Sequence, residues 1–113
     1  MKPGNISISS ILQADGQTKQ RPVVLLAEFP PFGDWLIAGV STQLQHHVPA
    51  LDEIVGDADP DYRASGLRAA SLIRGGNLMV YPAERIRGRI GSISENRLRR
   101  LLTKLADFLR PPA

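Results

Sequence analysis

Residues 22–40 have the sequence PVVLLAEFPPFGDWLIAGV, and this stretch decides the fold class. Residues 22–27 form a continuous apolar run with β-branched members, which is typical of a strand buried on both faces. Pro30 and Pro31 end that strand, because proline cannot donate the hydrogen bond that a β-ladder needs. Residues 35–40 are apolar again, so we predict two antiparallel core strands joined by a proline-rich loop.

Shorter segments on both sides of this pair also have strand character. Residues 5–9 alternate between polar and apolar side chains, which predicts a strand with one buried face. Gly16 lies in a predicted turn, since glycine tolerates a positive φ. After the central pair we predict strands or bends at residues 70–73, 78–81 and 87–93. Gly75-Gly76 predicts a turn between the first two of these strands.

Residues 43–68 have a weaker pattern and contain an acidic stretch. Residues 52–61 include five carboxylates interrupted by Gly56 and Pro60. We expect a long surface excursion here, with a short strand or a helical turn near residues 51–55. Loops of this length in small domains are often functional.

The C-terminal segment predicts an amphipathic helix. Ser94 is a good N-cap, and Pro111 ends the helix. One face consists of apolar side chains at helical spacing, namely Leu98, Leu101, Leu102, Leu105, Phe108 and Leu109. The basic residues, including Arg97, are expected on the other faces. Residues 1–113 are thus predicted to form one mainly β domain, a small twisted barrel of about five to seven strands that is capped by a C-terminal amphipathic helix.

Charge is distributed unevenly along the chain. Residues 1–61 carry three basic and eight acidic residues, a net charge of −5, whereas residues 62–113 carry eleven basic and three acidic residues, a net charge of +8. Ten of those eleven basic residues are arginine, whose guanidinium matches phosphate oxygens. This asymmetry indicates either an anionic partner or a basic surface that is only solvated.

Cysteine is absent, which excludes a disulfide and a thiolate metal site and suits a reducing compartment. The N-terminus lacks the apolar core of a signal peptide. No apolar run approaches the ~18 residues of a membrane span. We therefore expect a cytoplasmic protein without membrane association.

Three segments, in this order, carry a resemblance to a known family. They are GQTKQRPVVLL at residues 16–26, LIAGVST at residues 36–42, and RIGSIS at residues 89–94 before the predicted helix. Together they resemble the MazF/PemK toxins of type II toxin–antitoxin systems, and the likeness extends over about residues 4–109. It implies an SH3-like barrel, a homodimer, a cognate antitoxin, and metal-independent cleavage of single-stranded RNA without a cofactor.

The resemblance also implies site residues. The family's catalytic arginine corresponds to Arg21, and its catalytic threonine corresponds to Ser41. Serine keeps the hydroxyl but lacks the methyl group that restricts χ1. Thr42 supplies the hydroxyl instead if the register is displaced by one residue. The family often has proline where this chain has Gly39.

Arg21 suits such chemistry because its guanidinium can stabilise negative charge on a phosphoryl group. A surface salt bridge is the alternative role for Arg21, and a strand-end cap is the alternative for Ser41. The remaining candidate substrate-binding residues are Thr42, Lys19, Gln20, Arg85 and Arg87. Alternation of Arg85, Arg87 and Arg89 predicts one shared face that follows a phosphate backbone, or else a solvated basic edge.

His46 and His47 offer a different chemistry, since two histidines can act as general base and acid. Adjacent residues on an extended chain point to opposite faces, which favours a solvated loop pair. Two functions therefore remain open. The first is a toxin endoribonuclease, and the second is a non-catalytic SH3-like binding module, either a gyrase-poisoning toxin relative or a degenerate RNA binder.

Overall fold

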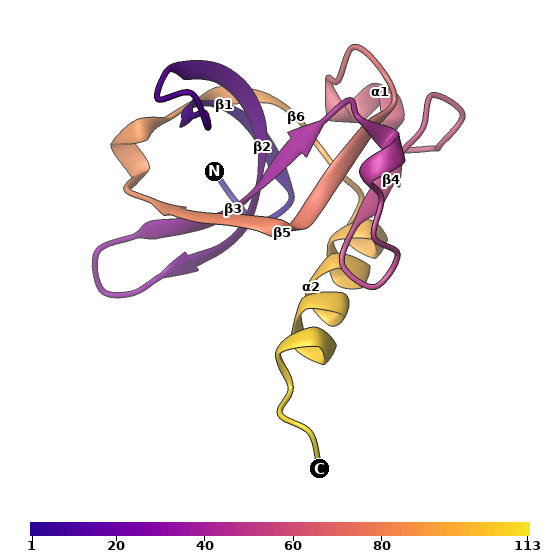
Figure 1. The fold of residues 1–113 in the computed structure, drawn as a ribbon. Helices are drawn as coiled ribbons and strands as arrows, with labels where there is room; N and C mark the ends of the chain where they lie inside the picture. The colour runs from indigo at the N-terminus through magenta and orange to yellow at the C-terminus, as the bar shows by residue number, and fades with distance from the viewer.

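The computed structural model describes residues 1–113, which form one six-stranded antiparallel sheet with a C-terminal helix. The sheet has the strand order β4-β5-β3-β2-β1-β6 and curls into a barrel-like shape (Figure 1). The strands are β1 (Asn5–Leu12), β2 (Thr18–Phe29), β3 (Asp34–Ser41), β4 (Glu53–Val55), β5 (Ser71–Tyr81) and β6 (Ile86–Ser92). The helices are α1 (Tyr62–Ser65) and α2 (Glu95–Leu109), with 3-10 turns at Leu44–His46 and Ala83–Arg85. The predicted fold class is confirmed.

Strand β2 is buried on both faces, as its apolar run predicts. Val24 and Leu26 point into a core cluster that α2 covers, which also contains Leu101 and Leu105. Their neighbours Val23 and Leu25 point the other way, into a smaller cluster that contains Trp35 and Ile37. Because successive strand residues face opposite sides, β2 and β3 each supply buried residues to both clusters. The second cluster matters for function, because Val23 and Leu25 lie on the same face of β2 as Arg21, which lines the candidate site.

Helix α2 begins where its N-cap predicts. The Ser94 hydroxyl accepts a hydrogen bond from the Arg97 amide at 3.2 Å. Only part of the predicted apolar face is covered: Leu101 and Leu105 are buried, whereas Phe108 and Leu109 are 62% and 71% exposed. Figure 1 shows why, since the C-terminal half of α2 extends beyond the sheet. Neither helix combines the length and the apolar character that a membrane crossing requires.

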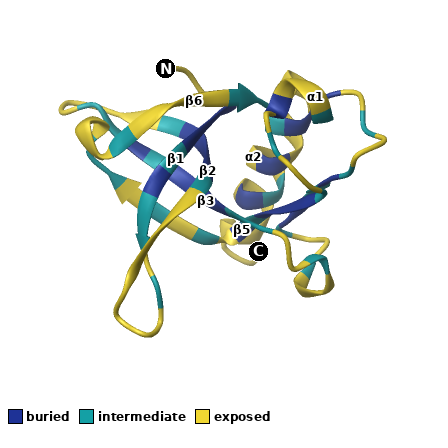
Figure 2. Ribbon diagram, turned by 90° about the horizontal axis from the view of Figure 1, so that it is seen from above, coloured by how far each residue is buried: buried dark blue, intermediate teal, exposed yellow.

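The short strand expected near residues 51–55 is present as β4, but the acidic stretch is not wholly on the surface as expected, and Arg97 is not on a solvated face of α2. Arg97 is only 5% exposed, and Glu53 and Asp61 are 8% exposed. The Arg97 guanidinium donates to both oxygens of Asp61 at 2.8 and 3.0 Å, and to Glu53 at 3.1 Å. Buried carboxylates need such partners, so the segment folds back onto α2 (Figure 2).

These contacts perturb the titration of the buried carboxyls. Hydrogen bonds from Arg97 outweigh burial and lower the pKa of Asp61 from 3.8 to about 2. Burial acts to raise the pKa of Glu53, but hydrogen bonds and charges from Lys104 and Arg100 outweigh it and lower that pKa. The cluster therefore ties β4 and its flanking loops to α2 at neutral pH.

The predicted turn at Gly75-Gly76 is wrong, because β5 continues through both glycines. The register shifts here: Ala38 lies opposite Leu78, whereas Gly39 lies opposite Arg74. Residues 75–77 are therefore extra residues in β5, which bulge opposite Gly39. Gly75 is required, since a Cβ there would lie 2.1 Å from the Leu51 carbonyl oxygen. Glycine allows a backbone-to-backbone approach rather than a chain reversal.

Candidate functional site

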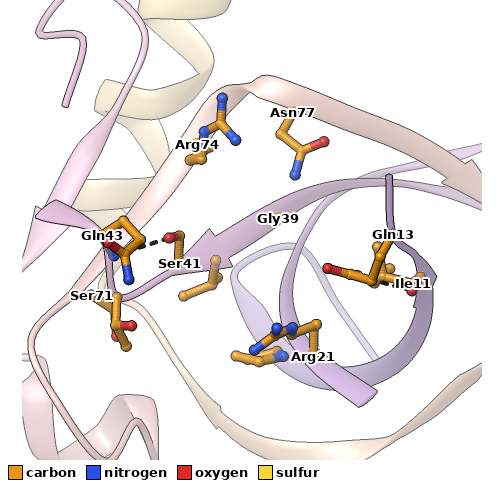
Figure 3. A pocket seen from close by; sticks show the side chains of 12 residues that line it. Ile11, Gln13, Arg21, Gly39, Ser41, Gln43, Ser71, Arg74 and Asn77 are labelled. Atoms are coloured by element: carbon orange, nitrogen blue, oxygen red, sulfur yellow. Dashed lines mark hydrogen bonds between the residues drawn. The ribbon is translucent and has the colours of Figure 1, made fainter. Parts of the chain in front are cut away.

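A pocket of about 310 Å³ lies where β2 begins, β3 ends and β5 bulges (Figure 3). The strands β5, β3 and β2 are neighbours in that order, so β3 forms its floor. It is lined by Ile11, Gln13, Arg21, Pro22, Gly39, Val40, Ser41, Thr42, Gln43, Ser71, Arg74 and Asn77.

The sheet register brings Arg21 and Ser41 to the same face. Val23 lies opposite Gly39, and this register, continued for two residues, places Arg21 opposite Ser41. Residues opposite one another on antiparallel strands point to the same side. Arg21 thus continues the row of Val23 and Leu25 out of the second core cluster, and it is exposed. The buried side chains of Val23 and Leu25 hold β2 in place, while the guanidinium of Arg21 is open to solvent.

The Ser41 hydroxyl is oriented by the turn that follows β3. Its Oγ accepts a hydrogen bond from the backbone N–H of Gln43 at 3.0 Å, which is drawn in Figure 3. The hydroxyl proton remains available to a ligand oxygen. Thr42 also lines the pocket and is exposed. Both candidate hydroxyls are therefore at the site, and Ser41 is the one that shares the face of Arg21.

Arg74 and Asn77 are among the lining residues that sequence reasoning missed. Both come from β5, on the far side of β3 from Arg21 (Figure 3). Arg74 precedes the bulge, and Asn77 is its last residue. Gly75-Gly76, which lies between them, was the one indication of a bulge in the sequence. A Gly-Gly pair occurs both in turns and in bulges, so the sequence alone does not distinguish the two.

The pocket has an uncompensated positive charge. Arg21 and Arg74 are its two cations, no carboxylate lines it, and neither arginine takes part in an ion pair. Guanidinium groups and hydroxyls are the donors that phosphoryl oxygens bind. The arrangement can hold a phosphodiester between two cations and stabilise the charge added to it in a transition state.

Four of the predicted substrate-binding residues do not line this pocket: Lys19, Gln20, Arg85 and Arg87. Lys19 lies two residues before Arg21 on β2 and so extends from the same face, at the rim. Gln20 points to the other face and donates to the Ser10 hydroxyl at 2.6 Å. Lys19 and Gln20 therefore lie on opposite faces of β2, because successive strand residues point to opposite sides.

The predicted arginine row does not form a regular strand face. Arg85 lies in a 3-10 turn, and its guanidinium carbon stacks 4.3 Å above the Tyr81 ring. Gly88 has a φ of +54°, and the pairing with β1 shifts between Arg87 and Arg89. A bulge between two residues breaks the alternation that would align them.

The histidine pair is separate from the pocket. His46 ends the 3-10 turn after β3 and is exposed, and His47 follows it. Neither lines the pocket. Of the two rival chemistries in the sequence, only the arginine–hydroxyl set is gathered at this site.

No protein-family model matches the sequence, and a search of curated proteins finds no relative. Solved structures do match. An endoribonuclease from a mycobacterial species, in complex with its cognate antitoxin, superposes with a TM-score of 0.69 at 13% identity over 99% of each chain. The Mycobacterium tuberculosis toxin MazF-mt6 matches with a TM-score of 0.68 at 20% identity, over 91% of this chain and 93% of the toxin. The chain has the MazF fold.

A third structure, another mycobacterial endoribonuclease, matches this fold with a TM-score of 0.66 at 12% identity over 99% of this chain and 94% of its own. The resemblance carried by residues 16–26, 36–42 and 89–94 therefore predicted the fold correctly. At this identity the MazF fold is shared while most side chains differ, so the chemistry of this chain has to be argued from its own pocket.

Proposed function

We propose that this chain is the toxin of a toxin–antitoxin pair, an endoribonuclease that cuts single-stranded RNA without a metal ion. The observation that carries the proposal is the pocket in which Arg21 and Ser41 share one face, with Arg74 across β3 and no carboxylate among the lining residues. Likeness to MazF endoribonucleases supports the same function.

In the proposed reaction the 2′-oxygen of a nucleotide attacks the adjacent phosphorus. The bond from phosphorus to the 5′-oxygen of the next nucleotide breaks, which leaves a 2′,3′-cyclic phosphate and a 5′-hydroxyl. The 2′-hydroxyl loses its proton and the leaving 5′-oxygen gains one. Arg21 donates to the phosphoryl oxygens and stabilises their added charge. The Ser41 hydroxyl, which the backbone N–H of Gln43 orients, donates to a phosphoryl oxygen and keeps the phosphate in line for attack.

Lys19, at the rim, and Arg74, across the floor, extend the positive charge on both sides of this phosphate. Gln20, Arg85 and Arg87 do not line the pocket and would contact more distant parts of the RNA strand. Backbone contacts of this kind position RNA without reading its sequence. We place the reaction in the cytoplasm, where messenger RNA is found.

We propose a homodimer and an antitoxin partner as well. Apolar side chains of α2 and β5 are uncovered, with Phe108 62%, Leu102 38% and Val80 55% exposed. A second copy related by two-fold symmetry would cover such surface. An antitoxin with an acidic, partly disordered segment would complement the pocket and block it. Sedimentation that gives only a monomer at micromolar concentration would contradict the dimer.

The test of the function is cleavage of a long single-stranded RNA in EDTA, with the cut sites mapped. Arg21→Ala is expected to slow cutting at least about 10²-fold, the usual cost of removing one stabilising donor. Arg63→Ala, an exposed arginine of α1 that makes no ion pair, is the matched control and is expected to cut normally. RNA binding without cuts would favour the binding-module alternative, and inhibition of gyrase supercoiling would favour the gyrase-poisoning form of it.

A further inference from the structure

The pocket contains three side-chain amides, and one of them has no partner within the protein. Gln13 donates to the Ile11 carbonyl at 3.0 Å, and Gln43 accepts from Gln45 at 2.8 Å. Asn77 makes no side-chain hydrogen bond, although it is partly buried. An amide has two donor hydrogens and an acceptor oxygen. Those of Asn77 are free for a ligand.

The Asn77 side chain lies over β3 at Gly39, where the absence of a side chain leaves room for it. A Cβ at position 39 would be 2.4 Å from Asn77 Nδ2 and 3.3 Å from Asn77 Cγ. Figure 3 shows the amide of Asn77 directed toward Gly39. Any side chain at position 39 would therefore displace the amide. Gly39 and Asn77 therefore form a matched pair.

Buried contacts hold the bulge that carries Asn77. The Asp52 carboxylate, in a residue that is 2% exposed, accepts from the Gly75 amide at 2.9 Å through one oxygen. Its other oxygen accepts from the Val48 amide at 2.8 Å. Asp52 thus fastens the bulge to the loop that leaves the pocket after β3. The position of Asn77 is set by the fold and does not depend on a flexible strand end.

We propose that Asn77 is a specificity-determining residue that reads one base beside the phosphate held by Arg21. The inference rests on the proposed RNA-binding function and goes beyond it, because it assigns sequence preference to a particular side chain. Bases of a single strand are unpaired and can be splayed out of their stack, so they offer their hydrogen-bonding edges to a protein. A paired donor and acceptor on an amide match a base edge that presents an acceptor beside a donor. The two arginines, in contrast, contact the phosphate that every nucleotide has.

The experiment selects short RNAs from a random-sequence pool that carries 2′-fluoro groups, so that the attacking hydroxyl is absent and bound RNA survives. We expect the wild-type protein to enrich a preferred base at one or more positions. Asn77→Ala should lower discrimination at a single position about 5- to 150-fold and leave the other positions unchanged. Gly39→Ala should do the same, and the double variant should be no worse than Asn77→Ala.

Gly76→Ala is the control, since a Cβ there meets only Leu51 Cδ1, at 3.6 Å, and should leave the preference intact. Circular dichroism and thermal unfolding of each variant identify any that fails to fold. The proposal is overturned if Asn77→Ala keeps the wild-type preference, if the wild type has none, or if Gly39→Ala and Asn77→Ala add independently. RNA that is selected with a preference but not cut when unmodified would contradict the proposed nuclease while leaving the role of Asn77 supported.

Discussion

Replacing Asp61 by asparagine tests the buried cluster that holds the acidic segment. The pKa of Asp61 is lowered from 3.8 to about 2, a difference worth about 2 kcal/mol at 1.36 kcal/mol per pH unit. A carboxyl whose pKa is depressed by folding stabilises the folded protein above its unfolded pKa. That contribution is complete at pH 7 and is lost as the pH falls from about 4 to about 2. Asp61→Asn removes the charge that Arg97 binds with two hydrogen bonds.

The assay is urea unfolding followed by the fluorescence of Trp35, the single tryptophan, which is buried. At pH 7 we expect Asp61→Asn to lower the free energy of unfolding by about 2 kcal/mol, which corresponds to a fall of about 8 °C in Tm. The difference from wild type should shrink as the pH approaches 2. The pKa of Glu53 is also lowered, but that carboxyl is present in both proteins and so affects both.

Asp57→Asn is the matched control, because Asp57 is in the same segment, is exposed, and makes no ion pair. Its stability should equal that of wild type at pH 7. The reasoning is refuted if Asp61→Asn is as stable as wild type at pH 7, or if its deficit is the same at both ends of the pH range.

Three further predictions concern the pocket and its supports. Ser41→Ala should slow RNA cleavage about 10²-fold with an unchanged melting temperature, whereas a normal rate would shift the role to Thr42. Arg74→Ala should weaken RNA binding for all sequences alike and reduce the slope of log affinity against log salt by about 1; an unchanged slope would show that Arg74 contacts no phosphate. Gly75→Ala should destabilise the protein severely, since its Cβ would lie 2.1 Å from the Leu51 carbonyl oxygen, and unfolding equal to that of Gly76→Ala would contradict the bulge.

The sequence predicted the elements whose determinants are local. Ser94 begins α2 because an N-cap is a local interaction. The apolar run of β2 predicted burial on both faces because it lacks alternation. Arg21 and Ser41 were assigned through the family resemblance, and the β2–β3 register then places them on one face.

Long-range contacts explain what the sequence did not predict. Nothing in the local sequence distinguishes Arg97 from the other arginines of α2. It is buried only because residues 53–61, which include its partners Glu53 and Asp61, pack against it. Asn77 reaches the pocket through a bulge that depends on Asp52, 23 residues from Gly75 in sequence. The exposure of Phe108 depends on how far α2 extends past the sheet.

The central claim is that the guanidinium of Arg21 promotes attack by a 2′-hydroxyl on the neighbouring phosphate. The most direct measurement uses a single-stranded RNA that contains the mapped cut site, and the same RNA with one 2′-deoxynucleotide on the 5′ side of that site. We predict that the unmodified RNA is cut in EDTA to a 2′,3′-cyclic phosphate and a 5′-hydroxyl, that the deoxy-substituted RNA gives no product, and that the Arg21→Ala protein cuts at least about 10²-fold more slowly. Cutting of the deoxy-substituted RNA, 5′-phosphate ends, or full activity of Arg21→Ala would contradict the claim.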